Sequence, residues 1–442
     1  MKKLLGLIFI LFFSKSFAQY PLILSQREQA RVIDEITDDR LRNVLPALMR
    51  REGIDMWVLI SRENNEDPVL RTMLPATWLA ARRTTMLVIF DRGADKELEY
   101  LAVARYDVGK IFKKAWDPST NIDQWIQLAK IIEERSPKKI GVNKADGFGH
   151  ADGLTSNDYD RLMEKLPKKF HPHVVSAQNL SVGWLETRTE KEMTLYPQLC
   201  RIAHQIIAEG LSDQVIHVGV TTTDEVEWWY REKIKELKLD SWFHPSVSVQ
   251  RNMDEEAFGK LPQPLVILPG DLIHVDFGIT YLRLNTDTQQ HAYVLRPGEN
   301  SIPDYLSNAF KRANKLQDIL ISNFKEGKTG NQILADSRKQ ANDQGITPSI
   351  YTHPIGYHGH ASGTNIGMWD MQNGIPKTGD YPMHNKTAYS IELNATVYVI
   401  EWKKEIRIML EEDGYFDEKG FRFIDGRQME IIPIPKAISN AK

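Results

Sequence analysis

Residues 274–295, HVDFGITYLRLNTDTQQHAYVL, decide the fold class of this 442-residue chain. They are rich in Val, Ile, Tyr and Thr, which favour strands, and LRLN between the two runs predicts the turn of a hairpin. An aspartate is expected inside each strand, Asp276 in the first and Asp287 eleven positions later. Aspartate is disfavoured in strands, and burying an unpaired carboxylate is costly. The two aspartates therefore indicate that this hairpin binds a ligand that compensates their charge.

Two further acids lie in segments that are expected to form the last strands. In SIELNATVYV, residues 390–399, apolar residues alternate with polar ones that include Glu392. In IRIMLEED, residues 406–413, Glu411 keeps the phase of Arg407. Residues of one phase share one face of a strand. Glu392 and Glu411 are therefore expected to project from strands onto the less apolar face.

Three histidines, His353, His358 and His360, lie between these acids in THPIGYHGHASG, residues 352–363. Oxygen donors with one imidazole suit manganese, cobalt or zinc. Four carboxylates match the charge of two ions, and two ions about 3.5–4 Å apart can share a water molecule and lower its pKa toward about 7. Taken singly, each acid is also compatible with a solvated strand residue or an ion-pair partner, and each histidine with a structural role.

The first half of the chain has the pattern of an α/β domain. The predicted strands are residues 54–60, 85–90, 98–103 and a shorter one near Ile140. A helical stripe over 41–49 precedes them, with Asp38 or Asp39 as its cap and a kink at Pro46. A domain boundary is expected near residues 184–188, before a capping box formed by Thr189 and Glu192. The second half has a further capping box, formed by Thr222 and Glu225, and helices are predicted over 303–324 and 331–342.

Residues 1–18, MKKLLGLIFILFFSKSFA, have the layout of a secretory signal peptide that is cleaved after Ala18. The alternative is a membrane anchor, but the apolar run over 4–13 is short for a bilayer. We therefore expect a secreted or periplasmic protein with no membrane contact after cleavage. The net charge of −3, with no block of like charge, disfavours nucleic acid as a partner. The single cysteine, Cys200, excludes an internal disulfide and is expected in the core.

The order of these residues resembles the creatinase, prolidase and aminopeptidase P family of M24-type metallopeptidases, whose catalytic domain has the pita-bread fold. Members carry an Asp in a D-x-G strand, a second Asp eleven residues on, a His in a G-H-x-x-G loop, a Glu in a strand and a final Glu before a terminal hairpin. The matching segments here are VDFG with Asp276, NTD with Asp287, GHASG with His360, SIEL with Glu392, and Glu411. For the last place Glu412 is second to Glu411, and Met409 holds the position where some relatives carry Glu.

The resemblance implies a two-domain α/β protein: a signal peptide over 1–18, a creatinase-like amino-terminal domain over 19–185, and an α+β pita-bread domain over 186–442. It implies that Asp276 binds one ion, that His360 and Glu392 bind the other, and that Asp287 and Glu411 bridge both. Manganese is the first expectation, with zinc or cobalt as alternatives. Glu392 would also carry a proton to the leaving nitrogen.

The chain departs from the family pattern in the residues that contact substrate. Gly356 and Gly367 stand where family histidines precede and follow the ligand histidine, and EEAFGKLPQ, residues 255–263, lacks another. The Arg that family members often carry after the second Asp is absent from TQQ, residues 288–290. Leu393 follows Glu392 at the position where the family usually has Pro. His353, His358 or His291 could substitute from other backbone positions, and His358 ranks first because it is close to His360.

These features predict an exported dinuclear metallopeptidase of the Xaa-Pro type, either an aminopeptidase or a dipeptidase, acting on peptides that contain proline. A homodimer is compatible with the resemblance. The alternative is a pita-bread module that has lost catalysis and binds peptide or protein. A metal-free amidinohydrolase similar to creatinase ranks last, because it would need the histidine that is missing before Asp276.

Overall fold

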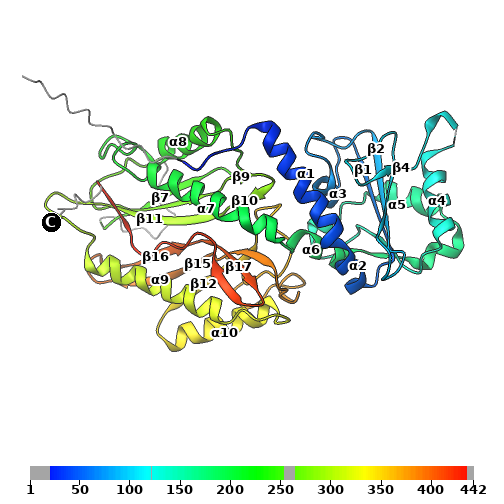
Figure 1. Ribbon diagram of the computed structural model, residues 1–442. Helices are drawn as coiled ribbons and strands as arrows, with labels where there is room; N and C mark the ends of the chain where they lie inside the picture. The colour runs from blue at the N-terminus through cyan, green and yellow to red at the C-terminus, as the bar shows by residue number, and fades with distance from the viewer. Residues whose placement is uncertain (1–19, 121, 253–263, 436–442) are drawn as a thin grey trace, which may run out of the picture.

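The computed structural model describes residues 20–120, 122–252 and 264–435. The expected signal peptide and the EEAFGKLPQ segment lie outside these residues. Figure 1 shows two parts side by side, with α1 (Gln26–Asn43) and α6 (Gln178–Glu186) where they meet. None of the helices in the described ranges is long and apolar enough to span a membrane.

The amino-terminal half is a six-stranded sheet in the order β4-β3-β2-β1-β5-β6, covered by helices on both faces. Its strands are β1 (Met56–Arg62), β2 (Thr84–Phe90), β3 (Glu99–Val103), β4 (Lys113–Lys114), β5 (Ile140–Val142) and β6 (Val174–Ser176). Its other helices are α2 (Leu45–Glu52), α3 (Pro68–Met73), α4 (Gln124–Arg135) and α5 (Ser156–Lys165), with single 3-10 turns at Pro118–Thr120, Gly149–Ala151 and Lys168–His173. Alternate residues of β1 enter different cores: Trp57 packs with α2 and α6, and Val58 packs with α4. Burial of both faces is why β1 reads as a continuous apolar run.

The predicted strands of this half are confirmed, but the predicted helix cap is wrong. Asp38 and Asp39 lie inside α1, which begins after Ser25 with a capping box to Glu28. The break expected at Pro46 is present, because α1 ends at Asn43 and Pro46 lies in the first turn of α2, where a missing backbone N–H costs least.

The carboxy-terminal half has mainly antiparallel sheets, with one parallel pair between the strands Thr288–Val294 and Ile432–Ile434, and two pairs of helices. Its helices are α7 (Glu190–Gly210), α8 (Thr223–Glu236), α9 (Asp304–Ser322) and α10 (Gly330–Asp343). Its strands are β7 (Ser246–Gln250), β8 (Leu272–Phe277), β9 (Thr280–Tyr281), β10 (Leu284–Asn285), β11 (Thr288–Val294), β12 (Thr347–Ile350), β13 (His353–Pro354), β14 (Thr387–Ser390), β15 (Leu393–Val399), β16 (Lys404–Leu410), β17 (Asp413–Asp417), β18 (Gly420–Phe423) and β19 (Ile432–Ile434). In Figure 1, α8 lies above the strands, α7 runs across them, and α9 and α10 lie towards the bottom.

Three sheets of this half meet around the acids. Their orders are β19-β11-β8-β7, β12-β15-β16 and β13-β14-β17-β18. The first two are joined by an isolated bridge between Gln289 and Glu411. Both capping boxes predicted for α7 and α8 are present, and Cys200 is buried in α7, as expected.

A buried ionic cluster lies at the junction of the two halves. Glu192 at the start of α7 accepts from Arg40 of α1 at 2.8 Å and from Arg188 at 3.0 Å, and all three side chains are fully buried. The two guanidinium groups also donate to the backbone carbonyls of Trp184 and Leu185. The ring of Tyr357 lies between the two arginines, at 5.0 and 5.1 Å.

Candidate metal centre

The predicted acidic ligands occupy the ends of strands and the crossings between sheets. Asp276 lies in β8 as expected, but Asp287 lies just before β11. Glu392 lies between β14 and β15, and Glu411 lies between β16 and β17. The prediction that the last three lie inside strands is therefore wrong. The physical reason for the two glutamates is that the chain passes from one sheet to another at each of them, so both lie where the sheets converge.

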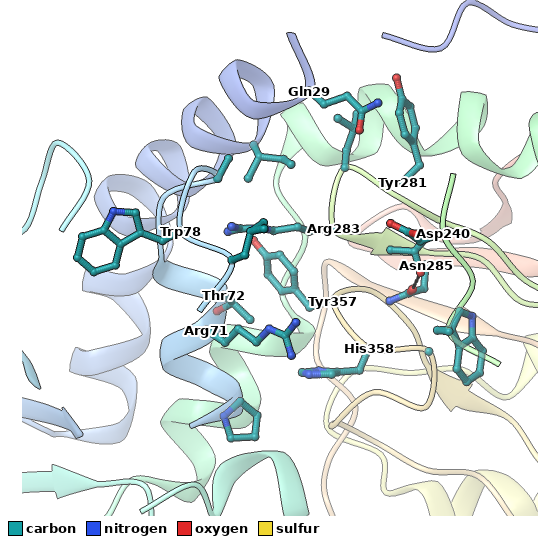
Figure 2. Close-up of a pocket in the computed structure, with 18 of the residues that line it drawn as sticks. Gln29, Arg71, Thr72, Trp78, Asp240, Tyr281, Arg283, Asn285, Tyr357 and His358 are labelled. Carbon is teal, nitrogen blue, oxygen red and sulfur yellow. Dashed lines mark hydrogen bonds between the residues drawn. The ribbon is translucent and has the colours of Figure 1, made fainter. Parts of the chain in front are cut away.

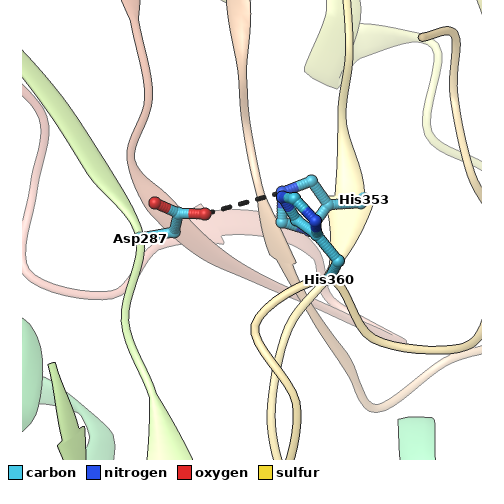
Figure 3. Close-up of side chains that lie close together, drawn as sticks. All are labelled: Asp287, His353 and His360. Carbon is cyan, nitrogen blue, oxygen red and sulfur yellow. Dashed lines mark ion pairs between the residues drawn. The ribbon is translucent and has the colours of Figure 1, made fainter. Parts of the chain in front are cut away.

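All five predicted ligands approach one another, together with a sixth residue, His353. The ligand atoms of Asp276, Asp287 and Glu411 lie within 4.8 Å of one another. The same holds for His353, Glu392 and Glu411, and for Asp287, His353 and His360. Figure 3 shows the carboxylate of Asp287 directed at the two histidine rings.

The sequence pattern places His353 among the substitute histidines and does not predict it as a ligand. Its Nδ1 lies 3.0 Å from the backbone oxygen of Pro354, which leaves Nε2 facing the acids. Nε2 lies 3.7 Å from Asp287 Oδ2 and 3.6 Å from Glu411 Oε1. The pairing of His353 with Ser390 in β14 brings it next to the crossing that carries Glu392. The position of His353 beside the acids follows from this strand pairing, because no local sequence pattern distinguishes His353 from His358.

Gln289 holds two of the acids together. Its side-chain amide donates to Glu392 Oε1 at 2.9 Å and to Glu411 Oε2 at 2.6 Å. The amide is oriented in turn by His274, whose Nε2 lies 2.8 Å from Gln289 Oε1. Ser390 donates a further hydrogen bond of 2.7 Å to Glu411 Oε1. The two glutamates are therefore positioned by neutral groups.

The centre strongly disfavours several like charges at once. Burial, with the negative charge of Glu411, raises the pKa of Asp276, Asp287 and Glu392 well above their ordinary values. Burial also opposes ionisation of Glu411, but hydrogen bonding and the charge of His353 outweigh it and lower its pKa. Burial lowers the pKa of His360 to about 4, so its imidazole is neutral and able to bind a cation at pH 7.

Three buried atoms at the centre have no hydrogen-bond partner within the described part of the chain: Asp276 Oδ1, Asp287 Oδ1 and His353 Nε2. Buried polar atoms of this kind are rare and call for a binding partner. Carboxylate oxygens with imidazole nitrogens are a donor set that suits manganese, zinc or cobalt. The residues present therefore fit divalent metal.

The alternative residues lie elsewhere. Glu412 points to the other side, where His204 Nε2 lies 2.7 Å from its Oε2 and Gln290 donates to its Oε1. The backbone N–H of Met409 donates to His291, which is buried behind β8. His358 is not in the three groups of neighbouring ligand atoms. It stacks on His150 with ring centroids 3.9 Å apart.

The two glycines that stand where the family resemblance predicts histidines are closely surrounded. A Cβ on Gly356 would lie 2.9 Å from the guanidinium of Arg188, which belongs to the buried junction cluster. Gly367 has a φ of +74°, and a Cβ there would lie 2.1 Å from the backbone oxygen of Ile350. Neither position accepts a side chain without a change in its surroundings.

A cleft of about 710 Å³ opens between the two halves, and His360 belongs both to its lining and to the metal centre. Figure 2 shows that Arg71 and Trp78 reach it from the amino-terminal half, and Arg283 and His358 from the other. Its size is typical of a site for a small ligand.

The sequence model of metallopeptidase family M24 matches residues 196–423. An X-Pro aminopeptidase from Thermotoga maritima MSB8 is a similar solved structure, with 16% identity, a TM-score of 0.62 and coverage of 88% of this chain and 99% of that one. An Xaa-Pro dipeptidase from Bacillus anthracis has 16% identity, a TM-score of 0.57 and coverage of 92% and 100%. A prolidase from Pyrococcus horikoshii OT3 has 14% identity, a TM-score of 0.56 and coverage of 92% and 100%.

No curated protein matches the chain. At these identities the solved structures establish the fold, and they confirm the expected α/β architecture with a pita-bread carboxy-terminal half.

Proposed function

The chain belongs to metallopeptidase family M24, and from that premise we propose that it is an exported enzyme that uses two divalent ions to hydrolyse peptide bonds next to proline. The observation that carries the proposal is the convergence of four acids and two imidazoles around buried atoms that lack partners in the described ranges. The preference for proline is supported by the solved relatives, which are named as X-Pro aminopeptidase, Xaa-Pro dipeptidase and prolidase. Export rests on the leader-like residues 1–18.

The proposed ligands are Asp276 for one ion, His360 and Glu392 for the other, and Asp287 and Glu411 for both. His353 is an additional candidate, because its Nε2 faces two of these acids. Manganese remains the first choice, with zinc or cobalt as alternatives. When bound, such ions would polarise the scissile carbonyl and lower the pKa of water.

Glu392 is the proposed proton carrier. Gln289 binds Oε1 of this carboxyl group and leaves Oε2 as the oxygen that can take up a proton and deliver it to the leaving prolyl nitrogen. His358 lines the cleft beside His360 and is the proposed substrate contact. Its neutral ring, whose pKa is lowered to about 3 by burial and by His150, can donate a hydrogen bond without carrying charge.

Metal stoichiometry tests the centre directly. The protein, stripped of metal, reconstituted with manganese or zinc and desalted, should retain close to two equivalents by elemental mass spectrometry. Asp287→Ala should lose most of this metal, because both ions share that ligand. Absence of retained metal in the unmodified protein would refute the dinuclear centre.

Hydrolysis tests the chemistry. Peptides with an Xaa-Pro bond should be cleaved by the metal-loaded protein, and matched peptides with alanine in place of proline should not. Asp276→Asn and Glu392→Gln should each reduce cleavage to background. Activity that survives either substitution would overturn the role assigned to that residue.

A catalytically inactive module that binds peptide or protein is the second candidate. Two observations favour it: the Gln289 amide occupies one oxygen of both Glu392 and Glu411, and glycine stands at two positions where family histidines are expected. Retained metal and peptide binding without hydrolysis would identify this function.

A further inference from the structure

One wall of the cleft carries two arginines, Arg71 and Arg283, that form no ion pair within the described residues. Arg71 projects from α3, and within the described ranges its side chain forms no ion pair and no hydrogen bond. Arg283 donates to the backbone oxygens of Leu74 at 2.8 Å and of Pro75 at 3.4 Å, at the end of α3. These acceptors are uncharged, and the carboxylate of Asp34 acts on Arg283 without forming a direct ion pair with it. Within the described residues, neither guanidinium group forms an ion pair.

The backbone that presents Arg283 is strained. The turn between β9 and β10 consists of Leu282 and Arg283, with φ of +54° and +63°. Such two-residue turns normally use Asn and Gly, because other side chains are disfavoured at positive φ. Strain of this kind persists where surrounding structure enforces it, and it is concentrated at binding sites. Here the turn holds Arg283 in the cleft.

A buried polar atom lies beside the arginines. His358 lies next to Arg71 (Figure 2) and stacks on His150 with ring centroids 3.9 Å apart, and its Nδ1 atom is buried without a partner in the described part of the chain. Asp240, an acid on the rim, already pairs with Lys235 at 2.6 Å. Trp242 packs against His360 at 5.1 Å and provides an apolar surface beside the metal centre.

We propose that Arg71 and Arg283 form a carboxylate-binding subsite that receives the free carboxyl terminus of a short peptide, so that the favoured substrates are Xaa-Pro dipeptides. The inference rests on the proposed function, because it assumes that a proline peptide enters this cleft. The apolar proline ring then lies along Trp242, and its carboxylate faces the arginine wall. In a longer peptide the carboxyl terminus lies further from the scissile bond, and an acidic side chain after the proline could take its place.

Binding and hydrolysis of Gly-Pro and of glycyl-prolinamide separate these possibilities. Binding is followed by the fluorescence of Trp78 and Trp242 in metal-free protein, and hydrolysis in protein loaded with manganese. Charge-assisted hydrogen bonds contribute about 10- to 100-fold in affinity, so Gly-Pro should bind at least about 10-fold more tightly than its amide. Arg71→Gln should abolish this preference, and Arg71→Lys should retain part of it.

Arg31→Gln is the matched control. Arg31 is an exposed arginine of α1 that pairs with Glu35 at 2.7 Å, and its loss removes the same charge outside the cleft. It should leave the preference for the free carboxylate unchanged. Gly-Pro-Asp-amide tests the second source of a carboxylate: tighter binding of this peptide than of Gly-Pro would overturn the assignment to the carboxyl terminus.

The two proposals fail in different ways. Hydrolysis of Gly-Pro and its amide with equal KM, or a preference that survives Arg71→Gln, would overturn the subsite and leave the peptidase intact. Binding that depends on Arg71 without hydrolysis would support the subsite and refute the peptidase. Absence of both binding and hydrolysis would overturn both.

Discussion

Buried charge is handled differently at the junction of the two halves and at the metal centre. At the junction, Glu192 lies between Arg40 and Arg188, and backbone carbonyls accept further hydrogen bonds from both guanidinium groups. At the centre, where four acids meet, a glutamine amide, a serine hydroxyl and a histidine contact Glu392 and Glu411, and Asp276 Oδ1 has no partner within the described residues. The acid of the first cluster has cationic partners within the fold, whereas in the second the pKa of three acids is raised. Buried acids paired with arginines indicate a structural role, and buried acids without a cationic partner indicate a site for a cation.

Removing the acid from the junction should have the largest effect. Glu192→Gln leaves two buried guanidinium groups without counter-charge, which should lower the free energy of unfolding by about 3–5 kcal/mol. Urea denaturation measures this change. Glu35→Gln, which breaks the exposed pair with Arg31, should change stability by less than about 0.5 kcal/mol. Equal effects of the two substitutions would remove the distinction between these clusters.

Removing an acid from the centre should have the opposite sign. Asp287→Asn relieves repulsion among the acids, so the metal-free variant should melt at a higher temperature than the metal-free parent. Manganese at about 100 times its Kd should stabilise the parent by about 2.7 kcal/mol and leave the variant unchanged. Thermal denaturation with and without metal tests this. A metal-free variant that is less stable than the metal-free parent would show that other groups of the protein already stabilise the Asp287 carboxylate.

Gln289 and Gln290 provide a matched pair within one strand. Gln289→Leu should weaken metal binding about 10- to 100-fold, because groups that orient ligands typically contribute this much. Gln290→Leu removes the same amide from Glu412 on the other side and should leave metal affinity unchanged. Competition with a chelator of known affinity measures both. Equal losses of metal affinity in the two variants would mean that the substitutions disturb the strand as a whole, and that Gln289 has no specific role in orienting the ligands.

The smallest expected effect is a pH dependence of the stability contributed by His204, which pairs with Glu412. Burial alone would lower the pKa of His204, but the charges of Glu412 and Asp425 outweigh it and raise it to about 10. Because this value lies above the ordinary 6.5, the stabilising contribution is complete below pH 6.5 and is lost as the pH rises through about 10. The stability difference between the parent and His204→Gln should therefore shrink over that interval. A constant difference would contradict the ion pair.

Much of the fold could be predicted from periodicity and capping. The apolar runs of β1 and β2 and the capping boxes at Thr189 and Thr222 are local signals, and local physics produced the expected elements. The helix cap at Ser25 was missed because the apolar stripe used to locate the helix starts well inside it.

Less of the candidate site could be predicted from local sequence patterns. The five expected ligands gather as the family pattern implied, although their roles remain a proposal. The proximity of His353 depends on its pairing with Ser390, and the amide bridge of Gln289 depends on how three sheets meet. The arginine wall joins residues more than two hundred positions apart, Arg71 and Arg283, and no sequence pattern links them.

The alternation along β11 also determines where the chain tolerates length changes. Gln289 serves the metal centre and Gln290 serves Glu412, so successive residues of one strand are committed to different clusters. Inserting one residue between Thr286 and Gln289 would exchange the two faces of the strand. Both clusters would lose their partners at once. Insertions at the exposed turn around Gly298, where a Cβ meets nothing within 4 Å, should be accepted. In homologues, gaps should therefore cluster in that turn and be absent from this strand.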